Sequence, residues 1–259
     1  MFSPLRVLFL IFSLLVVVNE ASPKLPATPP GVAATPPVIV IGFVGGYVRH
    51  DDRVHTEVQL VDRLREEYAP GIFVQTFENH RGNVAHKAVL QLLDANRDGH
   101  LTAEEKQNAR IIIFGHSWGA SETVELARLL QKDGIPVLLT IQVDSVSKIG
   151  ENDSVIPPNV AQAINFYQLD GVLHGQPRIR AANPSRTRIL GNFRSEYKSK
   201  PLTCGQYPWY DRVFMKPHIQ IECDPAVWTQ VESLIRSNLS LEARLPSPTE
   251  NSTVASPLK

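Results

Sequence analysis

The chain has 259 residues, 43% of them hydrophobic, which is enough for one substantial domain with a buried core. Lys and Arg together number 26 and Asp and Glu also number 26, so the formal net charge is zero. Without a global basic field, the chain is not expected to bind nucleic acid or another polyanion.

The first segment, residues 1–21, has the pattern of a secretory signal peptide. Arg6 precedes an apolar run from Val7 to Val18, and the small residues Ala21 and Ser22 follow. The run is short for a membrane span, so we expect cleavage and a secreted or extracytoplasmic protein, in the periplasm or cell envelope. The alternative is an uncleaved signal anchor, which would be the chain's one contact with a membrane.

Pro-rich segments flank the predicted folded domain. Residues 22–37, SPKLPATPPGVAATPP, predict a linker that does not pack. Residues 245–259 are polar and Pro-rich and predict a disordered tail. The domain itself is predicted to span residues 38–244.

Strand and helix patterns alternate along this domain. Continuous apolar segments predict buried strands, and apolar positions at helical spacing predict amphipathic helices. The expected strands cover residues 36–48, 71–77, 110–116, 137–146, 163–169 and 187–193, and the expected helices cover 53–68, 83–94, 117–134 and 225–239. This alternation predicts an α/β domain with a mainly parallel sheet, whose active site would lie at the carboxyl ends of the strands.

Residues 115–119, Gly-His-Ser-Trp-Gly, fit the pattern G-x-S-x-G. The motif alone is weak evidence for a nucleophilic serine. Here it follows an apolar strand and opens a helix, which is the structural context expected of such a serine. The two glycines would relieve crowding in a sharp strand-to-helix turn that exposes the hydroxyl of Ser117. The alternative is a serine that caps an ordinary helix.

With this motif in this setting, residues 38–241 resemble an α/β-hydrolase, which implies a three-layer α/β-hydrolase-like domain. The family's triad runs serine, acid, histidine along the chain. The resemblance implies that Ser117 is the nucleophile and that His218, just before the last helix, is the base, with His174 as the alternative. Asp144 is the preferred acid because it follows the stronger strand, and Asp170 is the alternative.

The same resemblance implies an oxyanion hole built from backbone N–H groups. Trp118, directly after the nucleophile, would supply one donor, and Phe43 or Val44, in the turn GFVGG, would supply the other. That turn lacks the G-x-G-x-x-G spacing and the Lys-Ser/Thr ending of phosphate loops.

Residues 94–105, DANRDGHLTAEE, match the EF-hand calcium loop position by position. Oxygen ligands on alternate residues, a turn glycine at Gly99 and a closing carboxylate suit a large hard cation. The predicted ligands are Asp94, Asn96, Asp98, His100 through its carbonyl, Thr102 and Glu105. The alternative is a helix capping box at residues 102–105 behind a polar turn. A single loop favours a structural Ca²⁺ ion over a sensor.

The two cysteines, Cys204 and Cys223, are expected to form a disulfide in an exported chain, with two free thiols as the alternative. Taken together, these features predict a secreted serine hydrolase that cleaves a small-molecule or lipid carboxylic ester and is stabilised by calcium. The alternatives are a thioesterase, acyltransferase or peptidase that uses the same triad, or a non-catalytic calcium-binding extracellular domain.

Overall fold

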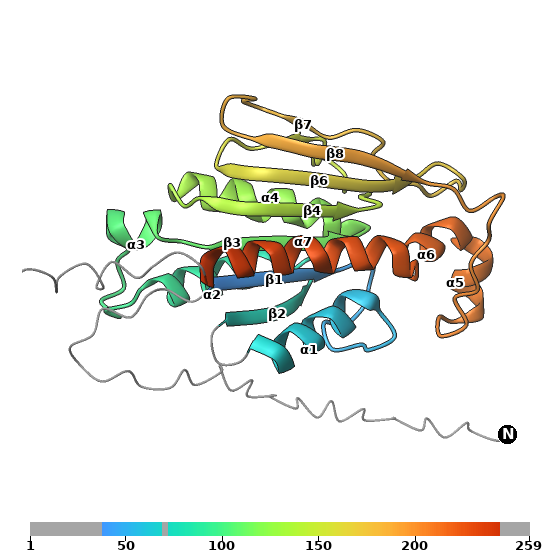
Figure 1. The fold of residues 1–259 in the computed structure, drawn as a ribbon, viewed down its shortest axis with the longest axis horizontal. Coiled ribbons are helices and arrows are strands. Elements are labelled where there is room, and N and C mark those ends of the chain that lie inside the picture. Colours follow the sequence, from blue (N-terminus) through green and yellow to red (C-terminus); the bar gives the residue numbers. More distant parts are fainter. Residues whose placement is uncertain (1–37, 69–71, 244–259) are drawn as a thin grey trace, which may run out of the picture. The chain divides into compact units, whose positions relative to one another are not determined.

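The computed structural model describes residues 38–68 and 72–243 (Figure 1). The predicted signal peptide, linker and tail lie outside the described residues, so the expectations for them stay predictions. Within the described ranges, no helix combines the length and the apolar composition that a membrane crossing needs.

A six-stranded sheet forms the centre of the domain, and neighbouring strands in it are parallel throughout. Two short strands, β5 (Val155–Ile156) and β7 (Arg180–Ala181), pair separately. The order of the main sheet reverses between β1 and β3, and such a switch point forms a crevice at the carboxyl ends of the strands. From edge to edge the strands are β2 (Ile72–Glu78), β1 (Val38–Val44), β3 (Ile111–His116), β4 (Val137–Val143), β6 (Val160–Gln168) and β8 (Arg188–Ser195).

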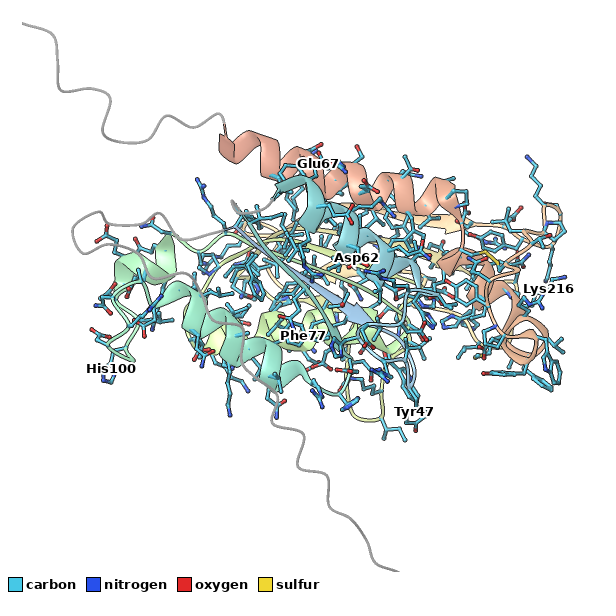
Figure 2. All side chains as sticks on the ribbon, turned by 90° about the horizontal axis from the view of Figure 1, so that it is seen from below. Tyr47, Asp62, Glu67, Phe77, His100 and Lys216 are labelled. Atoms are coloured by element: carbon cyan, nitrogen blue, oxygen red, sulfur yellow. A yellow bond between two sulfur atoms is a disulfide. The ribbon has the colours of Figure 1, made fainter. Side chains whose placement is uncertain are left out.

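Helices cover both faces of this sheet, which gives three layers (Figures 1 and 2). One face is covered by α1 (Thr56–Tyr68) and α7 (Pro225–Ala243). The other is covered by α2 (Gly82–Leu93) and α4 (Trp118–Lys132). The predicted three-layer α/β-hydrolase-like domain with a mainly parallel sheet is therefore confirmed.

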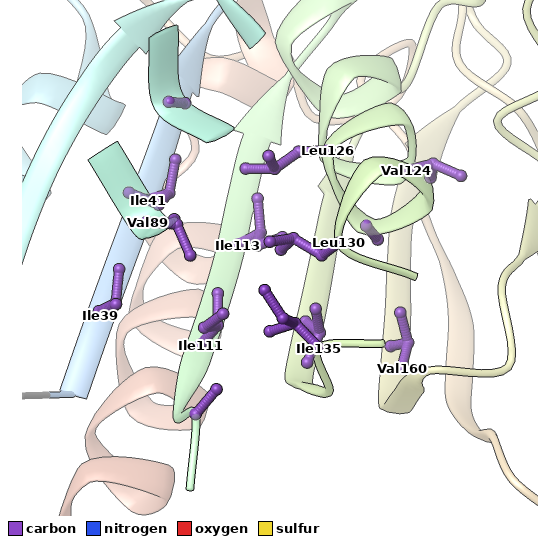
Figure 3. Close-up of a cluster of buried hydrophobic side chains, with 14 of the residues drawn as sticks. Ile39, Ile41, Val89, Ile111, Ile113, Val124, Leu126, Leu130, Ile135 and Val160 are labelled. Carbon is purple, nitrogen blue, oxygen red and sulfur yellow. The ribbon is translucent and has the colours of Figure 1, made fainter. Parts of the chain in front are cut away.

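Alternate side chains of the central strands enter two separate cores. Ile41 and Ile113 pack with α2 and α4 in one core (Figure 3). Val40 and Ile112, the preceding residues of β1 and β3, pack with α1 and α7 in the other. Because a strand buried on both faces is mostly apolar, β1 and the first four residues of β3 form hydrophobic runs.

Three short helices lie outside the main predicted helices: α3 (Ala103–Gln107), whose start the alternative capping box at residues 102–105 had indicated, α5 (Trp209–Phe214) and α6 (Lys216–Glu222). Such short segments cannot display a helical repeat of apolar residues, so apolar spacing does not reveal them. In Figure 1, α3 lies beyond the amino ends of the strands, and α5 and α6 lie beyond the carboxyl ends. The predicted disulfide is present, and it joins Cys204, ahead of α5, to Cys223 at the end of α6.

Candidate active site

Ser117 stands at the turn between β3 and α4, beside the crevice where the strand order reverses. Its φ is +58° and its ψ is −126°, a backbone conformation that residues with a side chain rarely adopt. A strained residue of this kind persists only where the surrounding structure enforces it, and such residues gather at functional sites. The side chain is 8% exposed.

The two glycines of the motif make this turn possible. A Cβ atom on Gly115 would lie 2.6 Å from the carbonyl carbon and oxygen of Gly119. A Cβ atom on Gly119 would lie 2.3 Å from the carbonyl oxygen of Phe43. Both contacts are with backbone, which cannot rotate away, so the spacing G-x-S-x-G follows from how closely β1, β3 and α4 approach.

His218 connects the serine to a carboxylate. Its Nε2 lies 2.8 Å from Oγ of Ser117, and its Nδ1 lies 2.7 Å from Oδ2 of Asp144. Asp144 directly follows β4 and His218 lies in α6. The imidazole and the carboxylate are both buried. The structure thus brings together the three residues that the sequence selected as nucleophile, base and preferred acid.

Four donors surround the carboxylate of Asp144. Its Oδ1 accepts from the backbone N–H groups of Gln168 (3.1 Å) and Gly175 (2.8 Å). Its Oδ2 accepts from the side-chain amide of Gln168 at 2.8 Å, in addition to the contact with His218. These hydrogen bonds fix the carboxylate against the ring. Sequence reasoning missed Gln168 and Gly175.

The two alternative candidates lie elsewhere. Asp170 Oδ2 accepts from the backbone N–H groups of Tyr197 at 2.6 Å and Lys198 at 3.1 Å. The backbone donor of Tyr197 is the main cause that lowers the pKa of Asp170. His174 is exposed, and its Nδ1 contacts the carbonyl of Gly175. Neither residue joins the Ser117 cluster.

The predicted oxyanion donors lie beside the nucleophile. Trp118 is the first residue of α4, and N–H groups in the first turn of a helix have no partner within the helix. Phe43 and Val44 are buried at the end of β1. The following residue, Gly45, comes still closer, since a Cβ atom there would lie 3.0 Å from Cβ of Ser117.

Asn79 secures the turn that carries these donors. Its side-chain amide donates to the carbonyls of Val44 and Gly46. Sequence reasoning missed both Asn79 and the close approach of Gly45, although the pair of glycines in GFVGG was the available signal.

A buried imidazole lies against the base. The rings of His116 and His218 are 4.5 Å apart between centroids and tilted by 34°. Burial lowers the pKa of His116 to about 4. We conclude that His116 is neutral at physiological pH, so it adds no positive charge next to the ring that must accept a proton.

The predicted calcium loop connects α2 to α3. Asp94 accepts hydrogen bonds from the backbone N–H groups of Asp98 and Gly99, at 3.2 and 2.9 Å. Glu105 accepts from the backbone of Thr102 at 2.8 Å, and the N–H of Glu105 donates to the Thr102 hydroxyl at 3.2 Å. These last two bonds are the capping box of the alternative interpretation.

The donor set of the loop fits a hard cation, because it offers carboxylate, amide and carbonyl oxygens. In the described structure its carboxylates do not gather within 4.8 Å of one another as a group of three. Figure 2 shows His100 at one end of the domain and Lys216 of α6 at the other. The calcium site therefore stays a prediction, and a cation there would lie far from Ser117.

Exposed apolar side chains occur after the carboxyl ends of several strands. They include Tyr47 after β1, Ile149 after β4, Val172 after β6, and Trp209 and Phe214 on α5. The ring of Tyr47 meets that of Trp118 edge-on, with centroids 5.7 Å apart. Apolar groups thus occur on several of the segments that follow these strand ends.

No family model and no curated protein matches the chain. Among solved structures, the thioesterase RedJ from Streptomyces coelicolor is 12% identical and has a TM-score of 0.33, with 79% of this chain and 98% of RedJ covered. A thermostable esterase from Pseudomonas putida is 12% identical and has a TM-score of 0.38, with 85% and 77% covered. Likeness at this level adds no argument to the one that the sheet and the site supply.

Proposed function

We propose that this chain is a serine hydrolase that cleaves carboxylic esters through Ser117, His218 and Asp144. The observation that carries the proposal is the unbroken pair of contacts from Ser117 Oγ to His218 Nε2 and from His218 Nδ1 to Asp144 Oδ2, at 2.8 and 2.7 Å. A serine hydroxyl becomes a useful nucleophile when an imidazole takes its proton and a carboxylate holds the imidazole in the correct tautomer.

In the first step, Ser117 Oγ attacks the ester carbonyl carbon while its proton passes to Nε2 of His218. The resulting imidazolium returns that proton to the leaving alcohol, which departs and leaves an acyl-serine. Water then attacks the acyl group with His218 again as base, releasing the carboxylic acid and restoring the serine. Asp144 stabilises the imidazolium in both steps and stays ionised.

The oxyanion of each tetrahedral intermediate would accept hydrogen bonds from the backbone of Trp118 and of the turn that contains Phe43 and Val44. One such donor contributes about 3 kcal/mol to transition-state stabilisation in acyl-transfer enzymes. The close packing of Gly45 on Ser117 supports this assignment, because it keeps the turn within reach of the reacting carbon.

The exposed apolar side chains beyond the strand ends favour an ester with an apolar acyl or alcohol group. A thioester, an amide or an acceptor other than water would use the same three residues, and these alternatives become outcomes of the assay below.

We further propose that the protein is exported and that one structural Ca²⁺ ion binds at residues 94–105. The disulfide between Cys204 and Cys223 supports export, because such bonds persist in oxidising compartments. The oxygen-rich loop supports calcium, and its place beyond the amino ends of the strands favours a stabilising role without part in the chemistry.

The test is hydrolysis of p-nitrophenyl esters of increasing chain length, together with labelling by a fluorophosphonate probe. We expect turnover and labelling in the wild type, and loss of both in Ser117→Ala with an unchanged circular dichroism spectrum. Ser121→Ala is the matched control, since this serine lies in the same helix and bonds to Glu151 instead. A folded wild type with neither labelling nor turnover would favour the non-catalytic binding domain.

A further inference from the structure

A second group of titratable side chains lies next to the base, and the proposed hydrolysis does not use it. His55 precedes α1, Glu57 lies in its first turn, His116 ends β3 and Glu222 ends α6. Glu57 is fully buried, Glu222 is 2% exposed and His116 is 3% exposed. The His55 side chain is 13% exposed, so the cluster reaches solvent on that side.

The ligand atoms of His55, Glu57 and Glu222 converge, and His116 adjoins the two carboxylates. Nδ1 of His55 lies 2.6 Å from one oxygen of Glu222, and Nδ1 of His116 lies 3.3 Å from the other. Nδ1 of His116 is also 3.9 Å from Oε1 of Glu57. Among the described residues, His55, Glu57 and Glu222 form the group of potential ligands whose atoms all lie within 4.8 Å of one another.

The carboxylate of Glu57 is poorly compensated. Both of its oxygens are inaccessible to solvent and lack a hydrogen-bond partner in the described structure. A buried carboxylate without a partner costs several kcal/mol, and a second buried carboxylate beside it increases that cost. Burial and the charge of Glu222 together raise the pKa of Glu57. A proton shared with Glu222, or a cation bound between the two carboxyl groups, would relieve this arrangement.

We propose that His55, Glu57, His116 and Glu222 form a binding site for a divalent transition metal ion of the Zn²⁺ class. Two carboxylates and two neutral imidazoles balance the charge of one divalent cation. Nitrogen ligands together with carboxylate oxygens suit zinc and its neighbours, whereas calcium and magnesium prefer oxygen alone. Ligand atoms at tetrahedral positions around zinc stand about 3.3 Å apart, and Nδ1 of His116 already has this separation from Glu222.

Two consequences follow for the surrounding structure. Metal binding replaces the hydrogen bond between His55 and Glu222. A His55 that starts protonated releases its Nδ1 proton to solvent, whereas a neutral His55 keeps its one proton on Nε2. The ion also joins α1, β3 and α6, and α6 carries His218. The site therefore anchors the helix of the proposed base without touching the reacting atoms.

The test is metal binding by the full-length protein, with the chelator removed and calcium restored in excess before the titration so that the loop at residues 94–105 is saturated. After stripping with a chelator, the wild type is titrated with Co²⁺, which gives a visible absorption band in a tetrahedral site, and then with Zn²⁺ in competition. We expect one equivalent per chain and an increased melting temperature. Metal analysis of protein purified without chelator should show the same stoichiometry.

Glu57→Gln should weaken Co²⁺ binding at least about 100-fold. Loss of a residue that only hydrogen-bonds a metal ligand lowers affinity about 10–100-fold, and loss of the ligand itself should lower it more. His55→Gln, at the accessible side, gives the same readout if Glu57→Gln fails to fold. The matched control is Glu122→Gln, because this buried glutamate pairs with Lys148 away from the cluster. The proposal would be overturned, in favour of a shared proton, by either of two results. One is a folded wild type that binds no Co²⁺, and the other is variants that bind Co²⁺ as tightly as the wild type does.

Discussion

Changing Asp144 to asparagine tests the proposed mechanism at its most specific contact. The four donors around the carboxylate determine the result, because an amide can accept at only one of its two ends. If the amide oxygen keeps the backbone donors of Gln168 and Gly175, its NH₂ group faces the side chains of Gln168 and His218. The new NH₂ group then faces two other donors, the side-chain amide of Gln168 and Nδ1–H of His218, so the hydrogen bonds from both are lost.

A hydrogen bond to a charged group contributes about 1.5–3 kcal/mol, so the two losses amount to about 3–6 kcal/mol. If most of this appears in the transition state, kcat falls by about 10² to 10⁴-fold, at 1.36 kcal/mol for each factor of ten. The upper value equals the loss that an acid-to-amide change causes in Ser-His-Asp proteases. Initial rates on a p-nitrophenyl ester measure the effect, and circular dichroism checks the fold.

Asp170→Asn is the matched control, because its carboxylate contacts the backbone of Tyr197 and Lys198 and not the imidazole. We expect its kcat to stay within about threefold of wild type, since its carboxylate contacts none of the three proposed catalytic residues. Two results would refute the assignment of the acid. One is a fall in kcat for Asp170→Asn as large as that for Asp144→Asn, and the other is a kcat for Asp144→Asn within tenfold of wild type.

The same control variant predicts a pH dependence of stability. Because the backbone donors lower the pKa of folded Asp170, its ionised form stabilises the fold above the unfolded pKa of about 3.9. This contribution is lost as pH falls through the lower, folded pKa. The difference in melting temperature between wild type and Asp170→Asn should therefore be largest near neutral pH and shrink in acid; a difference that stays constant with pH would contradict a role for these backbone donors.

Three further changes test other parts of the structure. Gly119→Ala should lower the free energy of unfolding by about 1–3 kcal/mol and remove most of the esterase activity, because the new Cβ would lie 2.3 Å from the carbonyl oxygen of Phe43. An unchanged urea denaturation curve would argue against this. Replacing Cys204 and Cys223 by serine should lower the free energy of unfolding by about 3 kcal/mol, as expected for their separation of 19 residues, and an equal urea midpoint would contradict it. Glu105→Gln keeps the capping box, so it should abolish calcium-dependent stabilisation while melting like wild type in chelator; retained calcium dependence would exclude the loop as the site.

The main elements of the fold were predictable because they depend on local pattern. Buried parallel strands are mostly apolar, and the helices that cover them are apolar on one side. The turn at Ser117 was predictable for a similar reason, since its two glycines are required by backbone contacts within and next to the turn. The helices α5 and α6, of six and seven residues, were too short to leave a repeat.

The choice between the two acids could not be made from sequence. Asp144 and Asp170 both follow a buried strand, and only the tertiary structure decides which side chain meets the imidazole. The partners of Asp144 were equally hidden, because Gln168 and Gly175 lie 24 and 31 residues away along the chain. The cluster around Glu57 was missed for the same reason, since its members come from three separate elements.

The order of the three residues along the chain also determines when the site can first exist. Ser117 and Asp144 precede His218 by 101 and 74 residues. During synthesis from the amino end, the strands that carry the first two are complete long before the helix that carries the third. A chain that has folded its sheet but not yet docked α6 therefore holds a serine without a base. If the proposed triad operates, catalysis begins only when α6 has docked, and the onset of turnover would report that step of folding.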